Sequence, residues 1–218
     1  GPLNSGIYKK AREKNIWSLE IINIRNFAID KHATVDDTPF GGGSGMLMRA
    51  DTLSLAMDKN INYKEKQKNI YLSPKGKKLE QKSVELISKA DTINIICGHF
   101  EGVDQRILET RNIEEVSLGD YILSGGETAS YVFLDAILRL IPGVLGNKNS
   151  TKEESFNNSL LEYPQYTKPQ KWEEKKVPDV LLSGDHAKIK GWRLSQSEAI
   201  TRRQRPDLWE KYIKKNKK

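Results

Sequence analysis

Short apolar segments alternate with helical patterns along this sequence, and this alternation constrains the fold more than any other feature. The apolar segments predict strands at residues 16–24, 69–73, 93–97 and 114–119. Helical patterns follow the last three of them, at residues 77–90, 103–111 and 127–142. Strands that alternate with helices predict a parallel sheet covered by helices on both faces, so we expect an α/β fold.

Glycine-containing loops follow the last three predicted strands. They read SPKG, GHFEG and GDYILSGGE, at residues 73–76, 98–102 and 119–127. In open parallel sheets, ligands bind outside the carboxyl ends of the strands. We therefore expect the three loops to open on one edge of the sheet and to form a binding site there.

These loops do not fit the usual phosphate motifs. A P-loop needs Ser or Thr after its Gly-Lys pair, but Gly76-Lys77 is followed by Lys78. The run GGGSGM ends in Met46, where a dinucleotide fingerprint needs glycine. A ligand with a flat, neutral portion fits better, since glycine backbone can close on an adenine edge while the side chains of residues 121–123 supply an apolar wall.

The net charge of +7 is concentrated near the C-terminus. Residues 168–218 hold 15 Lys and Arg against 7 Asp and Glu, a net charge of +8, whereas residues 1–167 hold 21 against 22, a net charge of −1. A surplus confined to one segment indicates a polyanionic partner, and nucleic acid is the usual one.

Other features of the composition favour the cytoplasm. The sequence has no apolar run long enough for a membrane-spanning helix, and its first residues contain no apolar core of a signal peptide. The single cysteine, Cys97, lies in an apolar run and is expected to be a buried, reduced thiol. One cysteine with three histidines predicts no zinc site.

The character of the sequence changes after Gly146. Residues 1–146 are expected to form the sheet domain, 147–163 a flexible linker, and 164–218 a small basic helical domain. In the last of these, Asp185 is a predicted N-cap, and Pro206 opens a second helix. One side of the first helix is expected to hold Ile189, Trp192, Gln196, Ala199 and Arg203, and the expected inward positions of the second helix are Trp209, Tyr212 and Ile213.

Six motifs in order resemble the TrmD family of bacterial tRNA (guanine-N1)-methyltransferases. They read TVDDTPFGGGSGMLM, YLSPKG, CGHFEGVDQR, SLGDYILSGGE, IPGVLG and VPDVLLSGDHAKIKGWR, and together they span nearly the whole chain. The resemblance implies a SPOUT-type fold, in which the α/β domain has a deep trefoil knot in its C-terminal half. It also implies one more strand before the first residue, and a homodimer with the active site at its interface.

The resemblance further implies methyl transfer from S-adenosylmethionine to N1 of guanosine 37 in tRNA, where a guanosine precedes it. A knot loop would wrap the bent cofactor, and Mg²⁺ would assist, although no ligand cluster in the sequence marks a metal site. Each glycine taken alone is typical of a tight turn. The cofactor contacts implied are Tyr71, Leu72, Pro74, Gly98, Glu101, Leu118, Gly119, Asp120, Tyr121, Ile122, Leu123, Gly125 and Gly126.

Two residues match catalytic positions of the family. Guanine N1 is a poor nucleophile until its proton leaves, so a carboxylate to accept the proton and a cation to stabilise charge on O6 are required. Arg139 matches the arginine assigned to the acceptor guanine, although a solvated arginine at a helix end is the simpler interpretation. Glu154 stands where the family has aspartate, and the adjacent Glu153 could share its role. Asp120 and Glu127 flank the knot loop and either hold the donor or cap turns.

The basic segment supplies candidate tRNA contacts. These are Lys188, Lys190, Arg193, Arg202, Arg203 and Arg205, which would bind the backbone, while residues 32–45 would help to read the acceptor base. Two alternatives stay open: a knotted methyltransferase acting on ribose or ribosomal RNA, and a non-catalytic RNA-binding relative.

Overall fold

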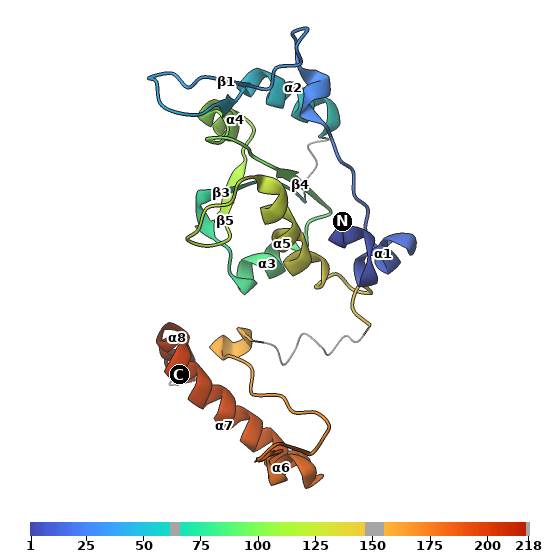
Figure 1. Cartoon of the computed structure of the whole chain (residues 1–218), viewed down its shortest axis with the longest axis vertical. Coiled ribbons are helices and arrows are strands. Elements are labelled where there is room, and N and C mark those ends of the chain that lie inside the picture. The colour runs from blue at the N-terminus through green and yellow to red at the C-terminus, as the bar shows by residue number, and fades with distance from the viewer. Residues whose placement is uncertain (62–65, 147–154, 217–218) are drawn as a thin grey trace. The chain divides into compact units, whose positions relative to one another are not determined.

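The computed structural model describes residues 1–61, 66–146 and 155–216. The chain divides into two compact units, Gly1–Gly146 and Asn147–Lys218, which are drawn in Figure 1. No helix in these described ranges is long and apolar enough to cross a membrane.

The first unit is built on a parallel sheet of three strands in the order β4-β3-β5. Strand β3 spans Gln67–Lys78, β4 spans Thr92–Ile96 and β5 spans Glu114–Ser117. Tyr71 in the central strand is level with Ile96 on one side and with Glu115 on the other. The predicted parallel sheet is therefore confirmed.

Helices cover both faces of this sheet because β3 alternates its side chains between two cores. Ile70 and Leu72 pack with Phe133 against α3 (Gln81–Ile87) and α5 (Gly126–Leu138). Tyr71 packs on the other face against α2 (Ala50–Asn60) and α4 (Gln105–Thr110). Figure 1 shows the two pairs of helices on opposite sides of the strands.

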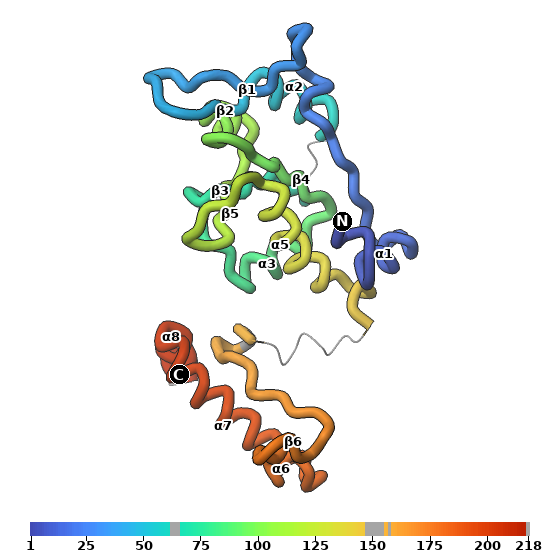
Figure 2. The backbone as a smooth tube through the Cα atoms, viewed as in Figure 1, coloured from blue at the N-terminus to red at the C-terminus, as the bar shows by residue number. Residues whose placement is uncertain are grey.

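The predicted strand at residues 16–24 is wrong. Residues 16–23 lie in no helix or strand, and Ile24 begins the short helix η2 (Ile24–Phe27). Figure 2 shows this stretch running along the unit from α1 (Gly6–Glu13) toward α2 without joining the sheet. Ile21 is 85% exposed, so apolar composition here does not reflect burial in a sheet.

The helix predicted at residues 77–90 is shorter than expected. Strand β3 continues to Lys78, and Lys77 pairs with Val116 of β5, so α3 begins only at Gln81. The strand runs on because residues 73–76 form a bulge, after which β3 returns to the same neighbour in β5. Outside the sheet, β1 (Asp36–Asp37) and β2 (Leu47–Met48) form a small antiparallel pair, and η1 (Pro2–Asn4) precedes α1.

The second unit is built around α7 (His186–Gln204) and α8 (Pro206–Asn216). Asp185 caps α7 by accepting hydrogen bonds from the amides of Ala187 and Lys188, both at 3.1 Å, as predicted. The unit also contains η3 (Asn157–Ser159), α6 (Asp179–Leu182), and a hairpin of β6 (Lys171–Trp172) and β7 (Lys175–Lys176). The hairpin was not expected in a helical domain.

The side of α7 predicted from the sequence is only partly buried. Ala199 and Arg203 are exposed, whereas Ser197 and Thr201 are buried. The hydroxyl of Thr201 accepts a hydrogen bond from the amide of Leu161 at 2.8 Å. Thr201 can be buried there because the preceding chain supplies a backbone partner for its hydroxyl. Residues 155–163, expected to be linker, thus include a stretch packed on α7, while 147–154 lie outside the described residues.

Candidate functional site

The three glycine-containing loops meet around one cavity of about 360 Å³ at the carboxyl edge of the sheet. The bulge of β3 supplies Ser73, Pro74 and Lys75, the segment after β4 supplies residues 98–103, and the segment after β5 supplies residues 117–119 and 121–126. Parallel strands in register bring their carboxyl ends to the same edge. The convergence expected from the sequence is therefore present.

The structure brings together most of the residues predicted to contact the cofactor. The wall of the cavity includes Tyr71, Leu72, Pro74, Gly98, Glu101, Leu118, Gly119, Tyr121, Ile122, Leu123, Gly125 and Gly126. Asp120 is not among the lining residues, and its carboxylate lies 3.7 Å from the ammonium of Lys78. Asp120 is thus paired with a lysine of its own unit, and it does not line the cavity.

Two glycines in these loops are required by contacts between backbones. A Cβ at Gly76 would lie 2.4 Å from the carbonyl carbon of Glu115 in β5, and a Cβ at Gly126 would lie 2.6 Å from Cα of Cys97. The amide of Gly126 donates a hydrogen bond to the carbonyl of Gly98 at 2.8 Å. The absence of a side chain at these two positions allows the three segments to approach one another. From the sequence, the glycines were expected only to let the backbone approach a ligand.

Tyr71 lines the cavity, and its aromatic ring lies against Gly98. A Cβ at Gly98 would lie 2.6 Å from Cε2 of this ring, so a side chain there would displace the tyrosine. Burial raises the pKa of the Tyr71 hydroxyl, with a smaller contribution from the charge of Glu115. The tyrosine is therefore a neutral apolar support for the loop at residues 98–102.

The side chains of residues 121–123 form an open, apolar part of the wall. Tyr121, Ile122 and Leu123 are 53%, 81% and 40% exposed, although they line the cavity. Phe100, from the neighbouring loop, is 54% exposed. The sequence predicted an apolar wall here, and the structure adds that much of it faces outward.

His99 is a residue that sequence reasoning did not single out. Its Nε2 lies 2.6 Å from a carboxylate oxygen of Glu127, in the first turn of α5. The pair links the loop after β4 to the start of α5, so Glu127 has a partner other than a ligand. The signal available in the sequence was the histidine within GHFEG.

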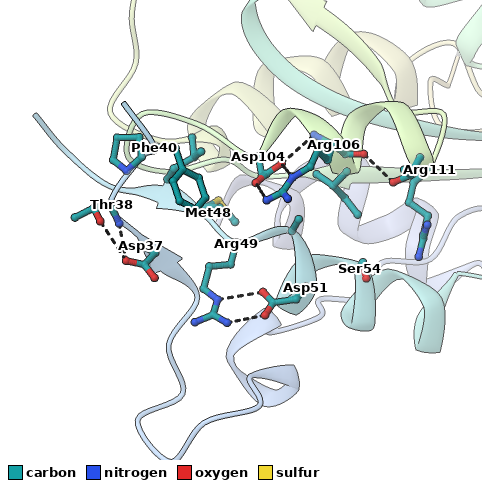
Figure 3. Close-up of a pocket in the computed structure, with 15 residues that line it drawn as sticks. Asp37, Thr38, Phe40, Met48, Arg49, Asp51, Ser54, Asp104, Arg106 and Arg111 are labelled. Carbon is teal, nitrogen blue, oxygen red and sulfur yellow. Dashed lines mark hydrogen bonds and ion pairs between the residues drawn. The ribbon is translucent and has the colours of Figure 1, made fainter. Parts of the chain in front are cut away.

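A second cavity, of about 690 Å³, lies beside the glycine-rich segment predicted to help read the acceptor base. Figure 3 shows Arg49 facing Asp51 across two hydrogen bonds, and Asp104 facing Arg106 in the same way. The hydrogen bond from Arg49 lowers the pKa of Asp51 to about 2, although burial opposes it. Because these charges are already paired, the smaller cavity at the sheet edge is the better candidate for a cofactor.

The glycine-rich segment and the residues directly after it contact the loop at residues 98–102, which lines the cavity at the sheet edge. The amide of Glu101 donates to the carbonyl of Met46, and the amide of Met48 donates to the carbonyl of Gly102, both at 2.9 Å. A Cβ at Gly45 would lie 2.5 Å from a carboxylate oxygen of Glu101. Phe40, at the outer end of this segment, is 99% exposed.

The predicted catalytic residues are not at this cavity within the described chain. Arg139 is the C-cap of α5, whereas Gly126 at the cavity begins that helix. Thirteen residues of helix separate them by about 20 Å. Glu154 and Glu153 lie outside the described residues. The arginine and the cavity therefore occupy opposite ends of one helix.

The predicted RNA contacts differ in their surroundings. Lys188, Lys190, Arg202 and Arg203 are exposed on α7. Arg193 stacks over the ring of Tyr163 at 4.8 Å, and Arg205 makes two hydrogen bonds to Asp207, at 2.8 and 2.7 Å. Lys188 has an ion pair with Asp185 at 3.2 Å. Lys190, Arg202 and Arg203 are thus better placed to meet a partner than the other three. Among the described residues, no group of His, Cys, Asp and Glu is arranged to hold a metal ion.

Comparison with known proteins gives one consistent result. Residues 1–211 match the family described as tRNA (Guanine-1)-methyltransferase TrmD. The chain is 68% identical over 214 residues to the tRNA (guanine-N(1)-)-methyltransferase of Pelagibacter ubique (strain HTCC1062), covering 98% of this chain and 93% of that relative. It is 50% identical over 218 residues to the protein of that name from Brucella canis, covering 100% and 88%. For that of Chelativorans sp. (strain BNC1), the identity is 52% over 209 residues, covering 96% and 89%.

Proposed function

The chain belongs to the tRNA (guanine-1)-methyltransferase TrmD family and methylates N1 of guanine in tRNA, and from this premise we propose that it transfers the methyl group of S-adenosylmethionine to guanosine 37 where guanosine is also at position 36. The observation that carries the proposal is the cavity formed by the three loops at the sheet edge. Its volume of about 360 Å³ lies within the range of small-molecule sites, near the lower end.

The residues of this cavity fit the cofactor. Peptide groups of Gly98, Leu118 and Gly125 would bind the edge of the adenine, and Ile122 and Leu123 would cover its face. When bound, the cofactor supplies an activated methyl group on a sulfonium. Closeness of the three backbones, as at Gly126 and Gly98, supports the family's trefoil knot as the architecture of these loops.

The acceptor guanine needs groups from this chain to activate it. The carboxylate of Glu154 would accept the proton of N1, which makes that nitrogen nucleophilic. The guanidinium of Arg139 would stabilise the negative charge that then forms on O6. Holding the acceptor in line with the methyl group would contribute much of the remaining rate increase.

A homodimer with its active site at the interface explains where Arg139 lies. The length of α5 separates Arg139 from the cavity of its own subunit by about 20 Å, so the arginine is better placed to serve the cavity of a partner. Exposed apolar side chains around the cavity and on α5, among them Ile122, Tyr131 and Val132, support such an interface.

The second unit would hold the substrate. Four exposed cations along α7 would bind tRNA phosphates: Lys188, Lys190, Arg202 and Arg203. Such contacts position the substrate but do not select its sequence. Residues 32–45, with their exposed Phe40, would contact the anticodon loop. A ribose or ribosomal RNA target and a non-catalytic role are not favoured, since the relatives compared are named as tRNA (guanine-N1)-methyltransferases.

A mixed-dimer experiment tests the shared site. Gly98→Val should abolish cofactor binding, because its side chain would strike Tyr71, and Arg139→Ala should remove activity while cofactor binding persists. Dimers that combine one subunit of each kind keep one complete site if the arginine acts across the interface. We expect co-refolded chains to recover activity that neither variant has alone. No recovery, with mixed dimers verified by mass, would show that cavity and arginine act within one chain.

A further inference from the structure

The hairpin of β6 and β7 is an exposed element with an unusual set of side chains. Its strands pair Trp172 with Lys175 and Lys171 with Lys176, and the amide of Val177 closes it by donating to the carbonyl of Gln170 at 3.0 Å. All six residues from 171 to 176 are exposed. The hairpin therefore presents its side chains to solvent.

Two of these side chains have the same charge at directly opposed positions. Lys171 faces Lys176 across the ladder, an arrangement that destabilises an antiparallel pair. Lys171 has an ion pair with Glu174 at 3.6 Å, but the side chain of Glu174 is itself 95% exposed, so this pair stabilises the hairpin little. A polyanion lying across the two lysines would remove the repulsion between them.

Trp172 adds an aromatic surface beside these charges. Its side chain is 63% exposed, and its cross-strand neighbour is another cation, Lys175. Proteins that bind single-stranded nucleic acid combine such aromatic faces, on which bases stack, with cations along the backbone path. Lysine is depleted at protein–protein interfaces, so the surrounding lysines favour nucleic acid over a protein as the occupant.

We propose that this hairpin is a tRNA-binding element, in which Trp172 stacks on an unpaired base and Lys171 and Lys176 bind phosphates. The inference rests on the tRNA-binding role proposed above for the second unit, whose segment 168–218 carries a net charge of +8. Glu173 and Glu174 at the turn repel phosphate. This repulsion directs the tRNA backbone toward the strands of the hairpin.

Stacking is tested by substitutions at Trp172 in the full chain, with unmodified tRNA as the ligand. Trp172→Ala should raise the Kd for tRNA about tenfold. Trp172→Phe should keep most of the affinity because it keeps an aromatic ring. Leu86→Ala is the matched control, since Leu86 is also exposed, at 60%, but lies on α3 of the other unit. Intrinsic fluorescence should be quenched by tRNA less in Trp172→Phe than in the wild-type chain.

The phosphate contacts are tested by salt dependence. Replacing Lys171 and Lys176 together by Gln should reduce the slope of log K against log salt by about 1 to 2. The control removes two exposed lysines of the other unit, Lys82 in α3 and Lys89 in the turn after it, and should leave the slope unchanged. The Kd for S-adenosylmethionine should stay the same in both double variants.

The results separate this inference from the function on which it rests. An unchanged tRNA Kd for Trp172→Ala, together with an unchanged slope for the double lysine variant, overturns the hairpin proposal. If Arg202→Gln with Arg203→Gln weakens binding in the same assay, the tRNA-binding role of the unit stands without the hairpin. A Trp172→Ala chain that dissociates into monomers while its subunits bind tRNA normally would instead assign the hairpin to a protein interface, and this too overturns the proposal.

Discussion

At the scale of single residues, Gly126 and Gly76 join the loops to their neighbours by contact between backbones. A methyl group at Gly126 would lie 2.6 Å from Cα of Cys97, and backbone atoms cannot move aside as a flexible side chain can. The segment after β5 would have to shift away from the segment after β4. Such a shift would open the cavity that the two segments share.

Gly126→Ala should therefore lower both stability and cofactor affinity. Overpacking of this kind costs about 1–3 kcal/mol of unfolding free energy. Gly191→Ala is the control, because Gly191 lies within α7 with open space around its Cα. Alanine in a helix interior should raise stability by about 0.5–1 kcal/mol. Urea unfolding and calorimetric titration with S-adenosylmethionine measure both effects, and equal behaviour of the two variants would contradict the packing account.

The sequence predicted which residues line the cavity better than it predicted their surroundings. Residues such as Gly98 and Leu118 could be identified from motifs, since those segments follow strands of a parallel sheet. The contacts of Asp120 with Lys78 and of Glu127 with His99 depend on how separate loops approach in space. No local pattern encodes such partners.

At the scale of elements, α5 connects the cavity at the sheet edge to the N-terminal helix. The hydroxyl of Tyr8 on α1 donates a hydrogen bond to the carboxylate of Asp135 on α5. Partial burial is the main cause that raises the pKa of Tyr8 to about 12, and the hydrogen bond and charge of Asp135 add to it. The contact therefore needs the tyrosine in its protonated form.

This contact predicts a pH dependence of stability. A raised pKa in the folded chain means that the stabilisation is complete below the ordinary tyrosine pKa of 10.0 and is lost as pH rises toward about 12. The difference in unfolding free energy between the wild-type chain and Tyr8→Phe should thus be constant from pH 8 to 10 and shrink above pH 10. A difference that stays constant to pH 12 would show that the hydroxyl does not stabilise the fold through Asp135.

Elements were predictable where apolar periodicity reflected burial. Strands β4 and β5 and helix α5 were expected close to their observed bounds, because their apolar residues form the two cores. Strand β3 was expected at its apolar part, but its continuation to Lys78 was not. Residues 16–24 have a similar composition but no neighbouring strand, and Ile21 and Ile22 remain exposed. Composition alone cannot supply the partner that a strand requires.

At the scale of the whole molecule, the chain combines a nearly neutral sheet unit with a basic C-terminal segment. This division suits an enzyme that binds a small cofactor in one unit and a large polyanion with the other. Phosphate contacts give affinity without sequence information, so selection of one guanine needs base-edge contacts near the cavity. Residues 32–45 and Arg139 are proposed for that role.

The measurement that tests the central claim most directly is methyl transfer from S-adenosylmethionine to an unmodified tRNA with guanosines at 36 and 37. Reverse-transcriptase arrest maps the product, and the same tRNA with adenosine at 37 is the control. The account predicts an arrest at position 37 in the first tRNA and none in the control, and it predicts that Glu154→Gln removes the arrest while tRNA and cofactor still bind. Arrest at another position, or an undiminished arrest with Glu154→Gln, would contradict the account.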